Sequence, residues 1–372
     1  MTAPDQPAHL ALRHPGGVTP ILIGLGALPE ARAHLEGWIA GRGVFLLSSP
    51  DILELHGAAL AQFRPAAARW AVLNVPDGEA AKTVETAERL WREMVAAGGK
   101  RDSRLIAFGG GSVGDLGGFV SGCFLRGISF LQVPTTLLAQ VDAAIGGKTG
   151  VDLPEGKNTV GLFHHPEMVV AETAFLATLP RAELRSGLVE AIKMAALLDV
   201  GLLARIEADL EALLAGDPAV LAPVAAAAAA AKVAVVERDP EEAGERRLLN
   251  FGHTLGHAIE SAAGYTGLRH GEAVAYGILF ALRLALRRGL AYSAAARLAR
   301  LLGRLDLPPL PPLAADDLLA LLARDKKARE SGLPWVLPEA LGEGRVVAGI
   351  ERPELAAELT PFLAEPFALP AA

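Results

Sequence analysis

The sequence is poor in cysteine and has no block of like charge. Cys123 is the only cysteine, so the chain can form no internal disulfide and no cysteine-rich zinc site. The net charge is −7, and acidic and basic residues are interspersed without a basic stripe. That pattern argues against a nucleic-acid-binding surface and against a charged interaction tail. The 372 residues, of which 51% are hydrophobic and 21% charged, are ordinary for a globular enzyme of two domains.

Long apolar runs are also missing. Residues 1–17 have no apolar run behind a basic start, so we expect no secretory signal. The longest apolar tract, Ala222–Ala231 and its flanks, is too short and too rich in alanine to span a bilayer. We therefore expect a soluble cytoplasmic protein that has no membrane partner.

Two regions of the chain differ in their secondary-structure pattern. Up to about residue 180, short apolar runs alternate with glycine-bearing loops and helical segments, which is typical of a parallel sheet with crossover helices. Beyond it, alanine and leucine dominate at helical spacing and strand signals nearly vanish. We expect an α/β nucleotide-binding domain with a largely parallel, Rossmann-like sheet at residues 1–179, followed by an α-helical domain at residues 180–372.

Individual elements follow from the same patterns. The expected strands are Val18–Ile23, Gly43–Leu47, Trp70–Val75, Arg104–Phe108, Phe130–Val133, Trp335–Leu337 and Arg345–Ala348. The expected helices are Ala27–Ala40, Ile52–Arg64, Glu79–Ala97, Arg181–Asp199, Gly201–Ala215, Pro218–Glu237, Thr254–Ala263, Gly271–Arg288, Tyr292–Leu302 and Ala315–Ala328.

Three of the nine histidines lie between residues 253 and 270. In the segment N-F-G-H-T-L-G-H (Asn250–His257), His253 and His257 are four residues apart, so they share one face of a helix, and His270 follows in R-H-G-E. Imidazole is the commonest protein ligand of transition metals and the usual proton carrier near neutral pH. Surface histidines are the alternative, but the glycines, the asparagine and the third histidine favour a metal or catalytic site.

A catalytic zinc takes about three protein ligands and keeps one position open. Spacing alone pairs His253 with His257 and requires a carboxylate from elsewhere in the chain. Glu190 in V-E-A-I-K offers that carboxylate, with Lys193 one helical turn further as an acid or base. A surface ion pair between Glu190 and Lys193 is the alternative. Spacing does not decide between them, nor which two histidines bind.

A glycine cluster, G-G-G-S-V-G-D (Gly109–Asp115), follows the expected strand Arg104–Phe108. A strand, a glycine loop and a helix start form a common phosphate site, because free N–H groups point at the ligand. The loop lacks the Lys-Ser/Thr ending of a P-loop, which argues against hydrolysis of a nucleoside triphosphate. Asp115 either holds a substrate hydroxyl or caps the helix. An earlier Gly24-Leu25-Gly26 has Pro29 near its third position and is interpreted as a turn.

Two lysines lie in glycine-rich segments further along. Lys148 and Lys157 are expected in loops, where they suit a phosphorylated, anionic ligand. Solvated loop lysines are the alternative, but Asp142 and Asn158 beside them favour a ligand site.

Together these motifs resemble those of the 3-dehydroquinate synthase family, within the sugar-phosphate cyclases. They run in family order over nearly the whole chain. The matching motifs are D-G-E-A-A-K (Asp77–Lys82), G-G-G-S-V-G-D (Gly109–Asp115), R-G (Arg126), V-P-T-T-L-L-A-Q-V-D (Val133–Asp142), G-G-K-T-G (Gly146–Gly150), G-K-N (Gly156–Asn158), L-A-T-L-P (Leu176–Pro180), V-E-A-I-K (Val189–Lys193), L-N-F-G-H-T-L-G-H-A-I-E (Leu249–Glu260), H-G-E-A-V (His270–Val274) and D-K-K (Asp325–Lys327).

The resemblance implies an NAD-binding domain before an all-α metal-binding domain, in a homodimer that uses Zn²⁺ or Co²⁺. It implies Glu190, His253 and His270 as metal ligands, with His257 contacting substrate instead. The positions that match NAD contacts are Asp77, Gly78, Glu79, Lys82, Gly111, Ser112, Val113, Gly114, Asp115, Thr135, Thr136, Lys148, Lys157, Phe175, Leu176, Ala177 and Thr178. The positions that match catalytic residues are Asp142, Lys148, Lys193, Asn250 and His257. The further substrate-binding positions are Asn158, Lys232, Arg246 and Lys326 or Lys327, with Arg126 matching an arginine donated across the dimer.

The activity implied is conversion of 3-deoxy-D-arabino-heptulosonate 7-phosphate to 3-dehydroquinate and phosphate. It proceeds by NAD-mediated transient oxidation, phosphate elimination, re-reduction and intramolecular aldol cyclisation. One departure from the family pattern is Ser48-Ser49, where Thr followed by Asp or Asn usually holds the adenosine ribose. A serine can still bond a ribose hydroxyl, but without charge.

Three rival functions remain. Another cyclase, such as 2-deoxy-scyllo-inosose or 2-epi-valiolone synthase, would use zinc, NAD and a phosphorylated substrate in the same way. A metal-dependent alcohol dehydrogenase of the glycerol dehydrogenase type would need no lysine-rich phosphate clamp. A catalytically dead binding protein on the same scaffold would have lost polar site positions, and apart from Ser49 these are all present.

Overall fold

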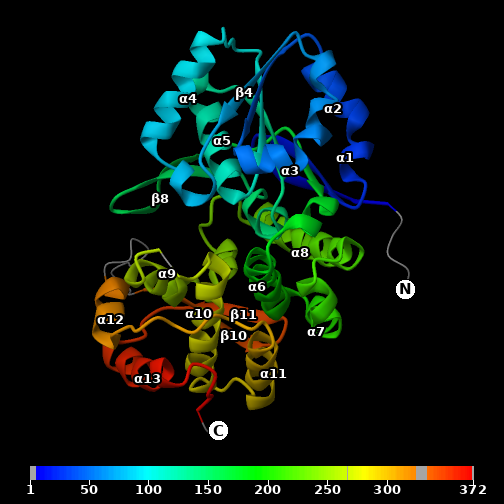
Figure 1. Cartoon of the computed structure of the whole chain (residues 1–372). Coiled ribbons are helices and arrows are strands. Elements are labelled where there is room, and N and C mark those ends of the chain that lie inside the picture. The colour runs from blue at the N-terminus through cyan, green and yellow to red at the C-terminus, as the bar shows by residue number, and fades with distance from the viewer. Residues whose placement is uncertain (1–5, 266, 324–332, 371–372) are drawn as a thin grey trace. The chain divides into compact units, whose positions relative to one another are not determined.

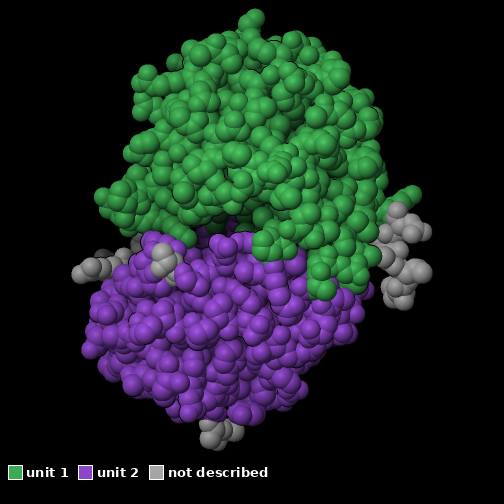
Figure 2. All heavy atoms as spheres, viewed as in Figure 1, with its two compact units in different colours: residues 1–180, 215–240 green, residues 181–214, 241–372 purple. Residues whose placement is uncertain are grey.

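The computed structural model describes residues 6–265, 267–323 and 333–370 and divides into two compact units, coloured separately in Figure 2. Unit 1 comprises residues 1–180 and 215–240, and unit 2 comprises residues 181–214 and 241–372. The domain ranges 1–179 and 180–372 expected from the sequence stay a prediction. By packing, residues 215–240 belong with the first unit.

Unit 1 is built on a seven-stranded sheet in the order β1-β2-β9-β6-β5-β3-β4. Its strands pair in parallel except for β1, which is antiparallel to β2. The strand bounds are β1 Ala8–His14, β2 Gly17–Gly24, β3 Gly43–Ser48, β4 Arg69–Asn74, β5 Arg104–Gly109, β6 Ser129–Pro134 and β9 Val169–Glu172. The largely parallel sheet expected from the alternating strand and helix signals is confirmed.

Helices cover both faces of this sheet (Figure 1). Successive residues of β3 point to opposite faces, so Val44 and Leu46 join one hydrophobic cluster while Phe45 and Leu47 join another. The helices of the unit are α1 Ala27–Glu30, α2 Arg32–Ile39, α3 Pro50–Ala61, α4 Val84–Ala96, α5 Gly111–Cys123 and α8 Pro218–Arg238. Short helical turns are η1 Arg64–Ala66, η2 Gly78–Ala81, η3 Phe124–Arg126, η4 Ala139–Ala143 and η5 Thr173–Thr178.

Three expectations for unit 1 are wrong in detail. The helix expected over Ala27–Ala40 is interrupted at Ala31, and the one expected over Glu79–Ala97 is split at Thr83, whose hydroxyl caps α4. Lys148 and Lys157 do not lie in loops but in a two-stranded hairpin, β7 (Lys148–Leu153) and β8 (Gly156–Phe163).

In the described part of the chain, α8 is the one helix long and apolar enough to cross a membrane by length and composition alone. It packs against β1, β2 and η4, and more than half of its apolar window is buried, as in a core helix. Helix α8 extends well beyond the apolar tract Ala222–Ala231, which alone is too short to span a bilayer.

Unit 2 is helical, as expected, with one late strand pair. Its helices are α6 Arg181–Leu198, α7 Val200–Leu214, η6 Glu245–Asn250, α9 His253–Ala262, α10 His270–Leu286, α11 Tyr292–Gly303, α12 Ala315–Ala323 and α13 Arg352–Ala364. The strands β10 (Trp335–Ala340) and β11 (Glu343–Val347) form an antiparallel hairpin. The helix expected to end at residue 328 is described only to Ala323.

Glycines allow α6, α9 and α10 to pack very closely. A Cβ on Gly277 of α10 would lie 1.8 Å from the carbonyl oxygen of Gly252, the residue before α9. A Cβ on Gly271, near the start of α10, would lie 2.1 Å from the carbonyl oxygen of Ser186 in α6. No side chain fits in either place, so glycine brings the three helix backbones together.

Candidate functional site

A carboxylate and three imidazoles meet where α6, α9 and α10 pack together. Glu190 comes from α6, His253 and His257 from α9, and His270 begins α10. Glu190 Oε1 is 3.7 Å from His253 Nε2 and 3.4 Å from His270 Nε2. One nitrogen from each of the three histidines lies within 4.8 Å of one from each other histidine.

The donor set fits a divalent metal. Glu190 is fully buried; its Oε1 accepts no hydrogen bond, and its Oε2 faces the ammonium of Lys193. A buried carboxylate is costly unless cations compensate it, and a divalent metal beside Oε1 would add to the compensation from Lys193. Two imidazole nitrogens and a carboxylate oxygen converging on one point form a donor set that zinc prefers.

The second ring nitrogen, Nδ1, of His253 and of His270 also has a polar partner. His253 Nδ1 is 3.2 Å from the carbonyl oxygen of Phe251, and His270 Nδ1 is 3.2 Å from Glu260 Oε2. Burial alone would lower the pKa of His270, but the carboxylates of Glu190 and Glu260 outweigh it and raise the pKa to about 10.

Lys193 approaches the same carboxylate. Its Nζ forms an ion pair with Glu190 Oε2, one turn away on α6, and 1% of its side chain is exposed. The surface ion pair that the sequence analysis left open is therefore wrong, because both groups are buried.

The other expected residues of unit 2 lie around η6. Arg246 is buried in it, and Asn250 ends it, donating from Nδ2 to Glu242 Oε1 at 2.5 Å. Lys326 and Lys327 lie outside the described residues.

In unit 1, the glycine cluster after β5 opens a helix, as expected. Gly110 is the N-cap of α5 and has no capping side chain, so the first turn, Gly111–Val113, presents backbone N–H groups. Thr136, after the neighbouring strand β6, lies against this turn, since a Cβ on Gly110 would be 3.1 Å from Thr136 Cγ2. Such a helix start suits an anionic group.

Lys82 joins several of the expected cofactor positions. Its Nζ donates to Asp115 Oδ2 at 2.9 Å and to Asn158 Oδ1 at 2.5 Å, with 3% of the side chain exposed. Glu79 Oε1 lies 3.5 Å from the same nitrogen. Burial alone would lower the pKa of Lys82, but Asp115 and Glu79 outweigh it and raise the pKa, so the ammonium stays charged. The backbone N–H of Asn158 in turn donates to Asp152 Oδ1 at 2.6 Å.

Two further contacts complete this network. Ser112 Oγ donates to Glu79 Oε2 at 2.9 Å, and Lys157 Nζ lies 4.0 Å from Glu79 Oε1. Asp115 lies a full turn inside α5, so the capping role that the sequence left open is wrong. Burial raises the pKa of Asp115, and Lys82 opposes that shift.

Buried hydroxyls without partners gather at the carboxyl ends of the strands. Ser49 follows β3, Thr135 follows β6 and Thr173 follows β9, and the hydroxyl oxygen of each is buried without a hydrogen-bond partner. Ser48, by contrast, donates its hydroxyl to the carbonyl oxygen of Phe108 at 2.7 Å, so this hydroxyl already has a partner within the protein. Ligands of open α/β sheets bind at this edge, so the three orphaned hydroxyls fit a polar cofactor there.

The expected turn Phe175–Thr178 lies in η5 at the same end of β9. Phe175 is buried and contacts the ring of Phe108, and Thr178 Oγ1 is 2.8 Å from His56 Nε2.

Asp142 and Lys232, both expected to contact substrate, lie together. Lys232 on α8 donates to the carbonyl oxygen of Asp142 at 2.5 Å and pairs with its carboxylate. Asp142 belongs to η4, a π-helical turn, and such turns are frequent at functional sites. Lys148 begins β7, and Arg126 ends η3 in a left-handed conformation with φ of 66°.

The early Gly24-Leu25-Gly26 forms a turn, as expected, and the side chain of Glu172 holds it in place. The carboxylate of Glu172 accepts the backbone N–H groups of Gly26, Leu28 and Ala174, each at 3.1 Å. The Glu172 carboxylate therefore already accepts the N–H groups that a phosphate would need at this turn.

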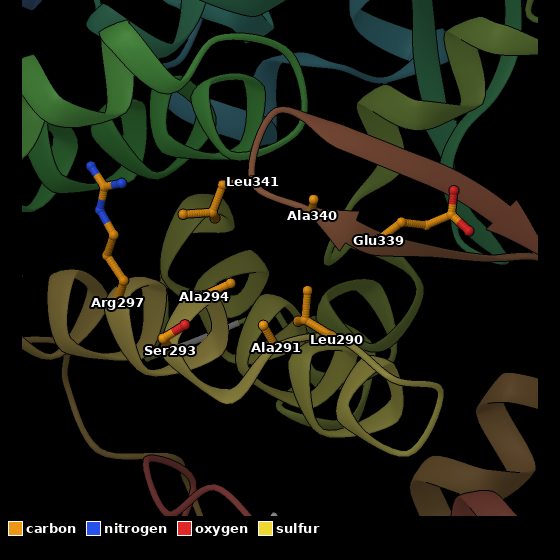
Figure 3. A pocket seen from close by; sticks show the side chains of 8 residues that line it. All are labelled: Leu290, Ala291, Ser293, Ala294, Arg297, Glu339, Ala340 and Leu341. Atoms are coloured by element: carbon orange, nitrogen blue, oxygen red, sulfur yellow. The ribbon is translucent and has the colours of Figure 1, made fainter.

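Unit 2 also has an open pocket between the start of α11 and the turn after β10 (Figure 3). Its charged residues already have partners, since Arg297 bonds Glu207 and Glu339 bonds Arg345. None of the described residues expected in the site lines this pocket. The lining residues are Leu290, Ala291, Ser293, Ala294, Arg297, Glu339, Ala340 and Leu341.

Three residues of these networks were not predicted from the sequence. Asp152 bonds Asn158, Glu242 bonds Asn250, and Glu260 supports His270. A signal for Glu260 was present, because it lies seven residues after His253 and three after His257, on the same helix face.

Comparison with known proteins agrees with the site geometry. Residues 72–186 match the family model "3-dehydroquinate synthase N-terminal", and residues 187–328 match "3-dehydroquinate synthase C-terminal". A 3-dehydroquinate synthase of Symbiobacterium thermophilum is 46% identical over 87% of this chain and 92% of its own length. One of Geobacter metallireducens is 44% identical over 87% of this chain and 91% of its own length.

Solved structures share the whole architecture. A 2-epi-5-epi-valiolone synthase of Streptomyces hygroscopicus, crystallised with NAD⁺ and Zn²⁺, has a TM-score of 0.85 and 29% identity, covering 93% of this chain and 97% of its own. A 2-deoxy-scyllo-inosose synthase complexed with carbaglucose-6-phosphate, NAD⁺ and Co²⁺ has a TM-score of 0.86 and 25% identity, covering 95% and 99%. The family models and these relatives together establish that the chain belongs to the 3-dehydroquinate synthase family.

Proposed function

We propose that this protein is a 3-dehydroquinate synthase, a carbon–oxygen lyase that converts 3-deoxy-D-arabino-heptulosonate 7-phosphate to 3-dehydroquinate and phosphate. The observation that carries the proposal is the convergence of Glu190, His253 and His270 on one point, within a chain whose residues 72–328 match the family models. NAD and Zn²⁺ or Co²⁺ are the proposed cofactors, because the two related cyclase structures contain NAD⁺ with one of these metals.

Glu190, His253 and His270 would hold the metal, and the α5 start with Glu79, Lys82 and their partners would hold NAD. When bound, the metal supplies a Lewis acid for the reacting oxygens and NAD supplies a reversible hydride acceptor. Ser49 would contribute its orphaned hydroxyl to the nucleotide as a neutral donor or acceptor.

Residues of unit 2 would act as general acids and bases. His257 lies beside both metal-binding imidazoles, with ring centroids 5.3 Å from His253 and 5.8 Å from His270, and it is not needed to complete a three-ligand site. It would therefore be available to take or give a proton at the substrate oxygens, with Asn250 nearby in sequence. Lys193 would balance the charge of Glu190 and contact substrate.

Lysines, arginines and their polar neighbours would fix the substrate's phosphate and carboxylate. The substrate-binding positions proposed in unit 1 are Arg126, Asp142, Lys148, Asn158 and Lys232, and those in unit 2 are Arg246 and Lys326 or Lys327. Charge-assisted bonds to phosphate are strong and directional, so they would orient the intermediates for a single outcome.

We also propose a homodimer in the cytoplasm. Leu125 and Arg126 both have positive φ, 50° and 66°, at a cost on the order of 1–3 kcal/mol each, and such strain clusters at functional sites. Leu125 is 41% exposed and Phe163 of β8 is 50% exposed. Both segments lie at the C-terminal end of α5, because Gly122 closely approaches Leu162 and His164. We propose that this apolar face meets a second copy and that Arg126 reaches across it.

The decisive experiment is to incubate the purified protein with the heptulosonate phosphate, NAD and zinc and to identify the product. We expect 3-dehydroquinate and one equivalent of phosphate, without net accumulation of NADH, because the hydride is returned. Steady growth of NADH absorbance would instead indicate an alcohol dehydrogenase, a fold to which the chain is similar at 11% identity with a TM-score of 0.68.

The rival within the superfamily is a cyclase acting on a phosphorylated sugar without the carboxylate. The structural likeness to 2-epi-5-epi-valiolone and 2-deoxy-scyllo-inosose synthases favours it, while the higher identity to 3-dehydroquinate synthases argues against it. Turnover of glucose 6-phosphate, the sugar counterpart of the carbaglucose-6-phosphate in one of these structures, with no turnover of the heptulosonate, would establish the rival.

A further inference from the structure

Glu260 lies behind one of the proposed metal ligands. It is on α9, and its Oε2 is 3.2 Å from Nδ1 of His270, with 5% of its side chain exposed. The other ring nitrogen of His270, Nε2, is 3.4 Å from Glu190 Oε1. The ring therefore lies between two carboxylates, one on the side of the metal ligands and one on the far side.

His253 has the same arrangement with a neutral acceptor. Its Nδ1 lies 3.2 Å from the carbonyl oxygen of Phe251, and its Nε2 lies 3.7 Å from Glu190 Oε1. A carbonyl and a carboxylate can only accept hydrogen bonds. In the neutral form that can bind a metal, Nδ1 of each ring would therefore carry the hydrogen and Nε2 would keep its lone pair. Both lone pairs then face Glu190, where a cation can bind.

We propose that Glu260 is a positioning residue for the metal site. It accepts the Nδ1–H of His270, fixes the ring's tautomer and orientation, and strengthens Nε2 as a donor through its negative charge. It also adds a negative charge near the site. This inference rests on the metal site of the proposed function and assigns a role to a residue outside the ligand set.

The test compares two buried glutamates of unit 2. Glu260→Gln keeps the volume but removes the charge, and its amide can accept or donate, so the tautomer of His270 is no longer fixed. Glu358→Gln is the matched control, because Glu358 is also buried, at 4% exposure, and pairs with Arg283 on α10. Zinc dissociation constants are measured by competition with a chromophoric chelator, and the cobalt-substituted proteins are compared by visible absorption.

We expect Glu260→Gln to weaken zinc binding about 10- to 100-fold and to change the cobalt spectrum. Glu358→Gln should keep both the affinity and the spectrum, even if it unfolds more easily. Equal losses in the two variants, or none in either, would overturn the inference, because Glu260 would then be only a packed charge.

Glu260→Asp provides a second measurement should the glutamine variant fail to fold. It keeps the negative charge, so we expect it to bind zinc more tightly than Glu260→Ala. Equal affinities in these two variants would also overturn the inference. Failure of the unsubstituted protein to bind zinc or cobalt would overturn the proposed metal site itself. Wild-type affinity and spectrum in Glu260→Gln would overturn the role of Glu260 alone.

Discussion

Lys193 and Glu190 form an ion pair in which both side chains are almost wholly withdrawn from solvent, at 1% and 0% exposure. They lie one turn apart on α6, which brings the ammonium directly against the carboxylate. Two cations, this lysine and a bound metal, would therefore share one buried anion.

Replacing Lys193 by Met should destabilise the metal-free protein far more than the metal-bound one. Removing one partner of a buried ion pair costs about 3–5 kcal/mol, because the remaining charge is left uncompensated. A divalent cation on Glu190 would compensate it, so saturating zinc should recover most of the loss. Urea unfolding with and without zinc measures both values, and an equal loss in the two conditions would contradict this balance.

Replacing His257 by Ala should separate metal binding from catalysis. We expect the variant to retain stoichiometric zinc after dialysis while turnover falls by about 100-fold or more, as for the loss of a general acid or base. The matched variant His253→Ala should lose zinc as well as activity. If His257→Ala loses its metal and His253→Ala keeps it, the ligand set is wrong.

Most of the parallel sheet could be predicted, because five of its strands are short apolar runs and three of these, β3, β5 and β6, are buried on both faces. The β7–β8 hairpin could not, since it is rich in glycine and charged residues that are typical of loops. Strand β9 has only four residues, too few for a periodic signal. The break at Thr83 depends on a side-chain cap, which hydrophobic periodicity does not register.

The residues of the candidate site were predicted largely from family motifs. Spacing alone predicted only some of them. The i, i+4 spacing pairs His253 with His257, whereas the contact of Glu190 with His270 joins residues far apart in the sequence. The same holds for Lys82 with Asn158. Glu260 was missed because a glutamate on a helix is usually a solvated residue, and only the fold shows that it is buried against His270.

Acid should weaken the fold partly through His164. Burial lowers the pKa of this histidine below its ordinary value of 6.5, although a bond from Nε2 to the carbonyl oxygen of Ile128 opposes the shift. Its contribution to stability is thus complete above pH 6.5 and is lost as the pH falls through the lower, folded-state pKa, because the unfolded chain binds the extra proton.

We therefore expect the free energy of unfolding to fall less steeply below pH 6.5 in His164→Gln than in the unsubstituted protein. Urea denaturation at several pH values down to about 5 measures this difference. His34→Gln, at an exposed histidine, should follow the unsubstituted protein. Parallel pH profiles for all three proteins would exclude His164 as a source of the acid sensitivity.

A charge on the apolar face at β8 should separate the proposed dimer. Phe163→Glu places a carboxylate where we propose that a second copy packs, so sedimentation velocity should show a shift towards the monomer. Val95→Glu, at a position on α4 that is 64% exposed, is the control and should leave the oligomeric state unchanged. A Phe163→Glu variant that sediments like the unsubstituted protein would place the interface elsewhere.

Helix α8 has a consequence for how the protein is made. It follows α6 and α7, which belong to unit 2, in the chain. Helix α8 itself belongs to unit 1, where it packs on β1 and β2. On the ribosome, which releases the N-terminal end first, the early sheet must wait for this helix while two helices of the later unit have already emerged. The two units are thus expected to mature in an interleaved order, and a polypeptide ending at residue 180 would leave the outer strands of its sheet uncovered.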